Sequence, residues 1–200
     1  MSVTTEPPLV WYVSYGSNMA ADRLAAYLGG GVPAGGRRAN PGARDATPPR
    51  RSEPVDLPGA LYFAGESPQW GGGVAFYDHD ATDRGPTAAR AYLVTAAQFA
   101  DIAAQEMHRV PAEGDPVERV LLDGFAGRHE VGPGRYETLL EVGRLEGLPL
   151  LVFTSPHGID AVPHTQPAPH YLAMLATGLR ESRGWDEARF AAYVGRVVAD

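Results

Sequence analysis

Cysteine is absent from the 200 residues of this chain. Its absence excludes disulfides, thiol nucleophiles and thiolate metal ligands. No apolar run approaches the length of a membrane span, and residues 1–8 contain neither a basic start nor an apolar signal core. With a net charge of −7, the chain also lacks the concentrated basic face that broad binding to nucleic acid needs. We therefore expect a cytoplasmic protein that binds neither nucleic acid nor membranes.

Glycine and proline are abundant by contrast, with 24 and 18 copies. Hydrophobic residues make up 44% of the chain and charged residues 20%, which is typical of a soluble globular protein, so we expect one domain over residues 1–200. A Gly-, Pro- and Arg-rich segment at about 29–58 shows no strand or helix period and is predicted to be a long loop. Its arginines are Arg37, Arg38, Arg44, Arg50 and Arg51. The segment either attracts an anionic substrate or is a solvated insert.

Short runs rich in β-branched and aromatic residues predict strands at 9–13, 60–64, 73–77, 90–95, 117–122, 136–142 and 148–154. Apolar residues at helical spacing predict helices after Asn18, over about 96–107, and over 170–198, where Gly184 separates two helices. Closely spaced strands joined by turns favour antiparallel pairing. We therefore predict an α+β fold, built as a small, mixed, mostly antiparallel β-barrel with flanking helices.

A turn of small residues joins the first strand to the first helix, and we expect it to bind a ligand. Gly16 permits backbone angles that a side chain would forbid and lets a ligand approach the main chain. Ser17 or Asn18 is expected to cap the helix, whose unpaired N–H groups favour a carboxylate or another anion. The predicted binding residues are Tyr12, Val13, Ser14, Tyr15, Gly16, Ser17 and Asn18. The alternative is an ordinary connection between a strand and a helix.

Glu106 stands on the apolar face of the predicted helix at 96–107. Phe99 and Ile102 precede it on that face at helical spacing, so a helix that packs them inward also turns Glu106 inward, whereas Asp101 and Gln105 can face water. Burial disfavours the charged form of a carboxylate, which makes an inward Glu a candidate general base. The alternative is a surface ion pair at the end of the helix with the basic residues that follow.

Two other arrangements of reactive residues are weaker. His157, His164 and His170 lie near Asp160, but their spacing matches no standard zinc motif. Ser17 lacks the G-x-S-x-G context of a hydrolase nucleophile. We therefore predict no metal site.

Several segments, taken in order along the chain, resemble the γ-glutamylcyclotransferase-like family. The turn Tyr12-x-x-Tyr15-Gly16-Ser17-Asn18-Met19 is similar to the signature of that family. Further similarity lies in Trp70-Gly71-Gly72-Gly73-Val74-Ala75, Ala91-Tyr92-Leu93-Val94, the helix Phe99 to Glu106, and Pro167-Ala168-Pro169-His170-Tyr171 followed by Gly178-Leu179. The resemblance covers most of the chain and places Glu106 on the acidic catalytic residue of the family.

The resemblance implies cleavage of a γ-glutamyl amide into 5-oxoproline and an amine, with Glu106 as general acid and base. It implies that backbone N–H groups at Tyr15 to Ser17 hold a carboxylate or oxyanion, and that Tyr171 positions a small-molecule substrate. No metal, nucleotide or other cofactor is required. Met107 departs from the family, which has glycine there, so two alternatives stay open: a hydrolase in which Glu106 activates water, and a binding module without turnover. The sequence leaves the oligomeric state undefined.

Overall fold

The computed structural model describes residues 7–198, so most of the N-terminal segment expected to lack a signal core lies outside the described residues. The strands are β1 (Leu9–Ser14), β2 (Arg51–Leu57), β3 (Ala60–Ala64), β4 (Val74–Asp78), β5 (Thr87–Thr95), β6 (Arg128–Glu130), β7 (Thr138–Leu145) and β8 (Leu148–Thr154). The α-helices are α1 (Ala21–Gly29), α2 (Ala96–Glu106), α3 (Pro116–Asp123), α4 (Pro169–Arg183) and α5 (Glu187–Val198). Three 3-10 turns complete the described elements: η1 (Ser17–Met19), η2 (Thr82–Arg84) and η3 (Ile159–Ala161). The predicted α+β composition is confirmed.

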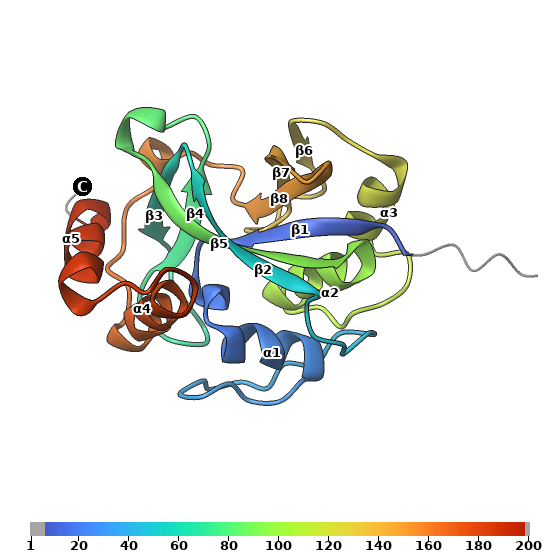
Figure 1. Ribbon diagram of the computed structural model, residues 1–200, viewed down its shortest axis with the longest axis horizontal. Helices are drawn as coiled ribbons and strands as arrows, with labels where there is room; N and C mark the ends of the chain where they lie inside the picture. The colour runs from blue at the N-terminus through green and yellow to red at the C-terminus, as the bar shows by residue number, and fades with distance from the viewer. Residues whose placement is uncertain (1–6, 199–200) are drawn as a thin grey trace, which may run out of the picture.

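Six strands form one open sheet in the order β2-β5-β1-β8-β7-β6, and β3 pairs with β4 in a separate hairpin (Figure 1). Neighbouring strands are antiparallel except β1 and β8, which are parallel. The mixed, mostly antiparallel pairing is therefore confirmed, but the predicted barrel is wrong. Closure would require the two edge strands β2 and β6 to pair, and β6 is an exposed strand of only three residues.

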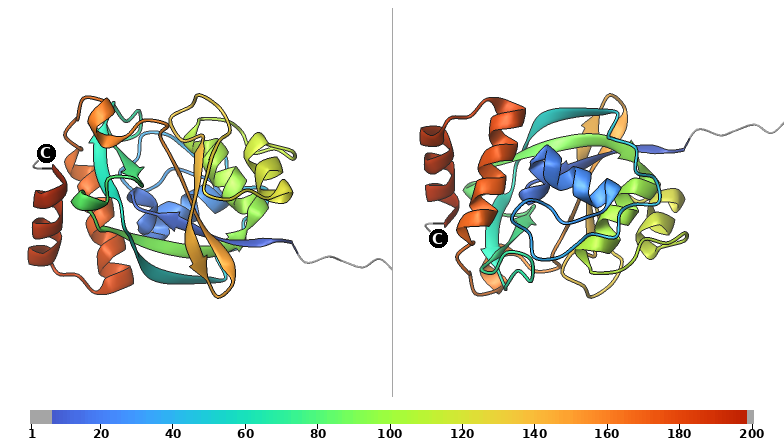
Figure 2. Two further views of the ribbon diagram at one scale, coloured as in Figure 1. Left: turned by 90° about the horizontal axis from the view of Figure 1, so that it is seen from above. Right: turned by 90° about the horizontal axis from the view of Figure 1, so that it is seen from below.

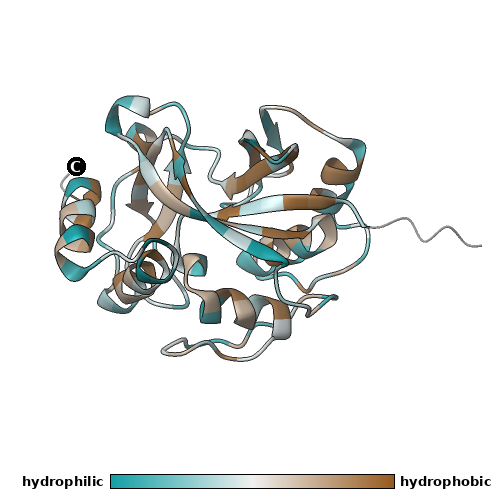
Figure 3. Cartoon of the chain, in the orientation of Figure 1, coloured by the Kyte–Doolittle hydropathy of each residue, from teal (hydrophilic) through white to brown (hydrophobic). Residues whose placement is uncertain are grey.

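Strand β1 lies inside the sheet and buries side chains on both of its faces, as its apolar run predicts. Trp11 and Val13 pack into one hydrophobic cluster, whereas Val10 and Tyr12 pack into the other. This split follows from the two-residue period of a strand. Figure 3 shows apolar residues along the strands of the sheet. Because β1 is held on both faces and both edges, the turn that follows it starts from a fixed position.

Two of the predicted secondary-structure assignments differ from the structure, one of them only in part. The run 117–122 is helix α3, which begins with the Asp115 side chain accepting from the Val117 N–H at 2.9 Å and with Pro116 in the first turn. An acidic cap followed by proline is a helix start, and it outweighs the β-branched composition of the run. The segment 29–58 is a loop only in part, because its last residues form β2 and pair with β5. Strand β6 also was not predicted.

The helices agree better with the sequence. Helix α2 spans the predicted residues and begins with a capping box in which Thr95 and Gln98 exchange side-chain and backbone hydrogen bonds of 3.1 Å. Helices α4 and α5 are separated by Gly184, which has the left-handed conformation that a helix end favours. Figure 2 shows these two helices side by side at one end of the molecule. None of the helices in residues 7–198 has the length and apolar character that crossing a membrane requires.

Helix α1 begins later than predicted. Ser17 to Met19 form the 3-10 turn η1, and the cap position of α1 belongs to Ala20, which offers no side-chain cap. Instead, the Ala21 N–H donates to the Glu181 carboxylate of α4 at 2.9 Å. The predicted capping by Ser17 or Asn18 is therefore wrong, and a carboxylate of the protein itself accepts this N–H at the start of the helix.

Helix α4 packs directly on η1. A Cβ atom at Gly178 would lie 2.4 Å from the Cβ of Met19, so only glycine allows this close approach. The contact places the first turn of α4, which carries Tyr171, against the turn that follows β1.

Candidate functional site

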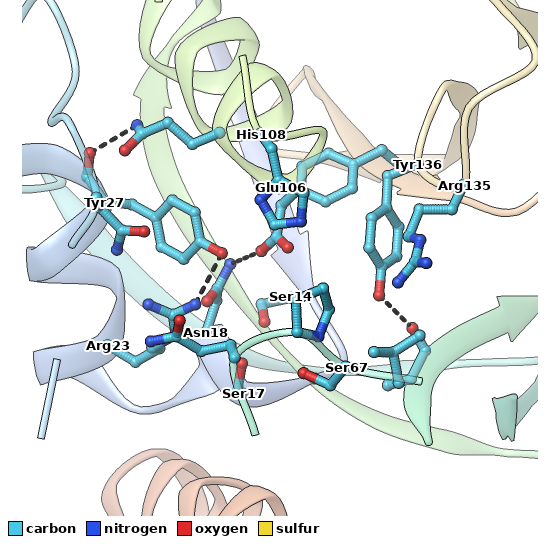
Figure 4. A pocket seen from close by; sticks show the side chains of 18 of the residues that line it. Ser14, Ser17, Asn18, Arg23, Tyr27, Ser67, Glu106, His108, Arg135 and Tyr136 are labelled. Carbon is cyan, nitrogen blue, oxygen red and sulfur yellow. Dashed lines mark hydrogen bonds between the residues drawn. The ribbon is translucent and has the colours of Figure 1, made fainter. Parts of the chain in front are cut away.

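A cavity of about 430 Å³ opens between the turn after β1, the end of α2 and the first turn of α4 (Figure 4). All nine residues that the sequence analysis predicted for the site line it: Tyr12, Val13, Ser14, Tyr15, Gly16, Ser17, Asn18, Glu106 and Tyr171. Polar and aromatic residues that the sequence analysis did not assign also line it, among them Arg23, Tyr27, Arg38, Asn40, Trp70, Gln105, His108, Arg109, Arg135 and Tyr136. The volume suits a small molecule.

The turn after β1 contacts α4 through Tyr171. The Ser17 N–H donates to the Tyr171 hydroxyl at 3.3 Å, and a Cβ atom at Gly16 would lie 2.6 Å from the same hydroxyl oxygen. Gly16 has φ −118°, so the expected need for unusual backbone angles is wrong. Glycine is required here because a side chain would collide with Tyr171.

Glu106 is held by an amide from the turn. Asn18 Nδ2 donates to Glu106 Oε1 at 2.9 Å and to the Tyr12 hydroxyl at 3.0 Å. Asn18 Oδ1, in contrast, is buried and has no hydrogen-bond partner among residues 7–198. Asn18 and Glu106 both line the cavity and lie beside each other in Figure 4, so the Glu106 carboxylate is available there as a hydrogen-bond acceptor, with the unpaired amide oxygen of Asn18 next to it.

Glu106 is the last residue of α2 and is half-buried. Met107, which stands where the resembled family has glycine, has φ −90°, a conformation that any residue adopts. The chain instead turns at His108, whose φ of 58° is left-handed. Arg109 lies within 3.5 Å of Asp115 and 3.4 Å of Glu137. The departure at Met107 therefore carries no backbone cost, and Arg109 pairs with carboxylates other than Glu106.

Buried tyrosines surround the carboxylate. Burial raises the pKa of Tyr12 and of Tyr27, and in both cases the nearby charge of Glu106 adds to the shift. Burial, followed by the same charge, raises the pKa of Tyr171 to about 12. The Tyr12 ring packs on Phe153 at 5.3 Å between centroids and edge-on against Phe99 at 5.7 Å. These hydroxyls therefore keep their protons at neutral pH and can serve as hydrogen-bond donors.

The Arg-rich segment covers α2 in a way that the sequence analysis did not predict. Asp101 is only 1% exposed and pairs with Arg44, whose Nη2 lies 2.8 Å from Oδ1. Gln105 is also buried and accepts from the Gly42 N–H at 3.2 Å. The expectation that Asp101 and Gln105 face water is therefore wrong, because the segment folds over that face of the helix. Residues 38–41 of the segment line the cavity.

Arg23 is the main functional candidate that the sequence analysis missed. It lies on α1, one turn before Tyr27, and its Nη2 donates to the Tyr27 hydroxyl at 2.9 Å. A charged residue four positions from a buried aromatic on the same helical face was the available signal. Among residues 7–198, the structure brings together no group of three His, Asp or Glu side chains that could hold a metal ion, at His157, His164 and His170 or elsewhere.

No protein-family model matches the chain. The chain is 29% identical over 203 residues to a protein of Arabidopsis thaliana named histone deacetylase 5, and the match covers 95% of this chain and 31% of that protein. It therefore spans about a third of the plant protein.

Among solved structures, the chain is similar to a γ-glutamyl cyclotransferase, with a TM-score of 0.52 and 13% identity over 92% of this chain and 85% of the other. It is also similar to an uncharacterized protein from Homo sapiens, with a TM-score of 0.52 and 15% identity over the same shares. At such identities the similarity shows the fold alone. The chain has the γ-glutamyl cyclotransferase-like fold.

Proposed function

We propose that this protein cleaves a γ-glutamyl amide by intramolecular aminolysis, releasing 5-oxoproline and an amine, with Glu106 as general acid and base. The observation that supports the proposal most is the Asn18–Glu106 hydrogen bond of 2.9 Å, which holds a single carboxylate in the cavity. A general base must be positioned within hydrogen-bond reach of the proton it removes. The fold shared with a γ-glutamyl cyclotransferase agrees with this chemistry without establishing it.

The acceptors beside Asn18 suit an amine. A γ-glutamyl group carries an α-ammonium, whose ordinary pKa is about 8. Glu106 and the unpaired Asn18 Oδ1 could both accept its N–H groups. Transfer of one proton to Glu106 exposes the nitrogen lone pair for attack on the γ-carbonyl of the same molecule. Because both reacting atoms belong to one substrate, binding in a folded shape supplies much of the acceleration through proximity.

The bond changes balance without water. The amine nitrogen forms a bond to the γ-carbonyl carbon and closes the five-membered ring, and the bond from that carbon to the leaving nitrogen breaks as Glu106 returns the first proton to the leaving nitrogen. The ring nitrogen loses a second proton when it becomes the lactam N–H, and Glu106 passes this proton to the released amine, which becomes an ammonium. The products are 5-oxoproline and a free amine, and Glu106 ends as it began.

Tyr171 suits the oxyanion that develops on the carbonyl. Its hydroxyl oxygen accepts from the Ser17 N–H at 3.3 Å. Because its pKa is raised to about 12, the hydroxyl is protonated at neutral pH and can donate. A positioned donor of this kind stabilises the transition state more than the ground state. The backbone N–H groups of Tyr15 and Gly16 are further candidate donors.

Mass spectrometry of reaction products tests the proposal. The purified protein is incubated with γ-glutamyl amino acids, γ-glutamyl amines and N-acyl amines that lack the α-amine. We expect 5-oxoproline and the matching amine from γ-glutamyl compounds only. Free glutamate in place of 5-oxoproline would instead identify a hydrolase, and binding without any product would identify a binding module. The match to the plant protein named histone deacetylase 5 covers only 31% of that protein and supports no deacetylase activity in this chain.

A further inference from the structure

Arg23 is a buried cation in the wall of the cavity. Its side chain is only 4% exposed, and its guanidinium lies 4.4 Å from the ring centre of Tyr27 and 5.5 Å from that of Trp70. Figure 4 shows the guanidinium close to Asn18 and Tyr27. The two rings attract the guanidinium through the partial negative charge of their faces, but neither ring carries a full negative charge.

The hydrogen bonding of Arg23 is incomplete. Nη2 donates to the Tyr27 hydroxyl, whereas Nε and Nη1 have no partner among residues 7–198. No carboxylate of those residues lies within ion-pair distance of it, although Arg90 and Arg183, which are also largely buried, pair with Glu181 and Asp56. A buried charge without a counter-ion is costly, and a side chain that leaves donors unsatisfied adds to that cost.

The charged residues that line the cavity favour the binding of an anion. Among residues 7–198, Glu106 is the only acidic residue in the lining, against Arg23, Arg38, Arg109 and Arg135. Arg109 is neutralised by carboxylates, and Arg38 and Arg135 are exposed at the rim. Arg23 is therefore the buried cation of the cavity that has no carboxylate of residues 7–198 within ion-pair distance, and Glu106 reaches it only through the Tyr27 hydroxyl.

We propose that Arg23 binds a carboxylate of the substrate. The inference rests on the proposed function for the identity of that substrate, which contains two kinds of carboxylate. One is the α-carboxylate of the γ-glutamyl group, and the other is the carboxylate of the released amine when that amine is an amino acid. Arginine suits either, since its planar, weakly hydrated cation pairs with carboxylates in desolvated sites.

Calorimetry with four ligands identifies the carboxylate. γ-Glutamylalanine has both carboxylates, and 4-aminobutyrylmethylamide has neither. γ-Glutamylmethylamide has only the α-carboxylate of the γ-glutamyl group, and 4-aminobutyrylalanine has only the carboxylate of the released amine. Binding is measured to Glu106→Gln, which keeps the shape of the side chain and prevents turnover, and to the same protein carrying Arg23→Met or Arg23→Lys. Arg37→Gln changes an exposed arginine outside the cavity and is the control.

With Arg23 present, we expect removal of one of the two carboxylates to weaken binding by at least about tenfold, the effect of a hydrogen bond to a charged group. With methionine at position 23, the same removal should change the affinity less than about twofold, and lysine should restore part of the discrimination. The carboxylate whose removal has this effect is the one that Arg23 binds.

Equal weakening in both backgrounds would overturn the inference, as would affinity that is indifferent to both carboxylates or absence of binding by all four ligands. If Arg23→Met does not fold, Arg23→Lys still tests the inference, because it keeps a cation and should reduce the discrimination between the ligands, whereas Arg37→Gln should leave that discrimination unchanged. Formation of 5-oxoproline by the unmodified protein reports separately on the proposed function. If 5-oxoproline forms but the discrimination between ligands does not depend on Arg23, the proposed function is supported and the carboxylate site is not. If the discrimination depends on Arg23 but no 5-oxoproline forms, the carboxylate site is supported and the proposed function is not.

Discussion

Asn18 and Glu106 are 88 positions apart in the sequence and are joined by a hydrogen bond of 2.9 Å from Nδ2 to Oε1. The bond connects the turn after the central strand β1 to the last residue of α2. Because Nδ2 also donates to Tyr12, a residue of β1, the position of the carboxylate is fixed by the centre of the sheet. A candidate base held in this way keeps its orientation before any ligand arrives.

Replacement of Asn18 by alanine should therefore lower turnover of a γ-glutamyl substrate by about 100-fold, since a small misplacement of a catalytic group has effects of this size. Tyr12→Phe removes only the second bond of the amide and should lower the rate by less than Asn18→Ala does. Steady-state kinetics on the two variants measures the difference. Equal rates in Asn18→Ala and the unmodified protein would show that Glu106 does not depend on this bond.

Substitution of Gly16 should act through Tyr171. An alanine Cβ at position 16 would lie 2.6 Å from the Tyr171 hydroxyl oxygen, although the backbone itself tolerates alanine at φ −118°. We expect Gly16→Ala to lower the free energy of unfolding by about 1–3 kcal/mol, the usual effect of overpacking. In the Gly16→Ala, Tyr171→Phe double variant the hydroxyl is gone, so the losses should be less than additive in urea unfolding. If the losses in the free energy of unfolding are additive, the strain in Gly16→Ala does not come from contact with the Tyr171 hydroxyl.

The Arg-rich segment should contribute to stability through Arg44. Arg44→Ala leaves the buried Asp101 carboxylate with only its hydrogen bond from the backbone N–H of residue 44, at 2.8 Å. We expect a loss of about 1.5–3 kcal/mol in urea unfolding, the size of a hydrogen bond to a charged group. Arg37→Ala, an exposed position in the same segment, is the matched control and should change little. A stability of Arg44→Ala equal to that of the control would mean that the segment does not fold over α2.

High pH should destabilise the protein. Burial raises the pKa to about 12 for Tyr62, Tyr77, Tyr171 and Tyr193. In the unfolded chain a tyrosine titrates near 10, so between pH 10 and 12 the unfolded state has lost protons that the folded state keeps. The stability from these groups is therefore complete below pH 10 and falls as the pH rises toward 12. Urea unfolding across this range should show the fall, with a shallower slope for Tyr193→Phe.

The sequence predicted elements whose signals are local. The run at 9–13 is buried on both faces, and the helix at 96–107 carries a cap, Thr95, that the structure uses. The run 117–122 has the composition of a strand but forms a helix, because Asp115 and Pro116 before it start one. Closure of the sheet could not be predicted, because it depends on whether two distant edge strands meet, which no local pattern records.

The sequence predicted eight residues of the candidate site from the turn and from the position of Glu106 on its helix, and Tyr171 from the family resemblance. These nine residues line one cavity. The environment of Asp101 was missed because helical spacing alone cannot show that a distant segment covers a helix face. Arg23 was missed for a related reason: its importance comes from the donors it leaves unsatisfied, and that absence becomes visible only when its neighbours in space are known.

The most direct test of the account is the rate of 5-oxoproline formation by Glu106→Gln, measured by mass spectrometry on a γ-glutamyl compound that the unmodified protein cleaves. Glu113→Gln makes the same chemical change at an exposed position and is the control. Loss of a general acid and base predicts a fall of about 100-fold or more for Glu106→Gln, with the control unchanged. Full turnover by a folded Glu106→Gln would contradict the assignment of Glu106.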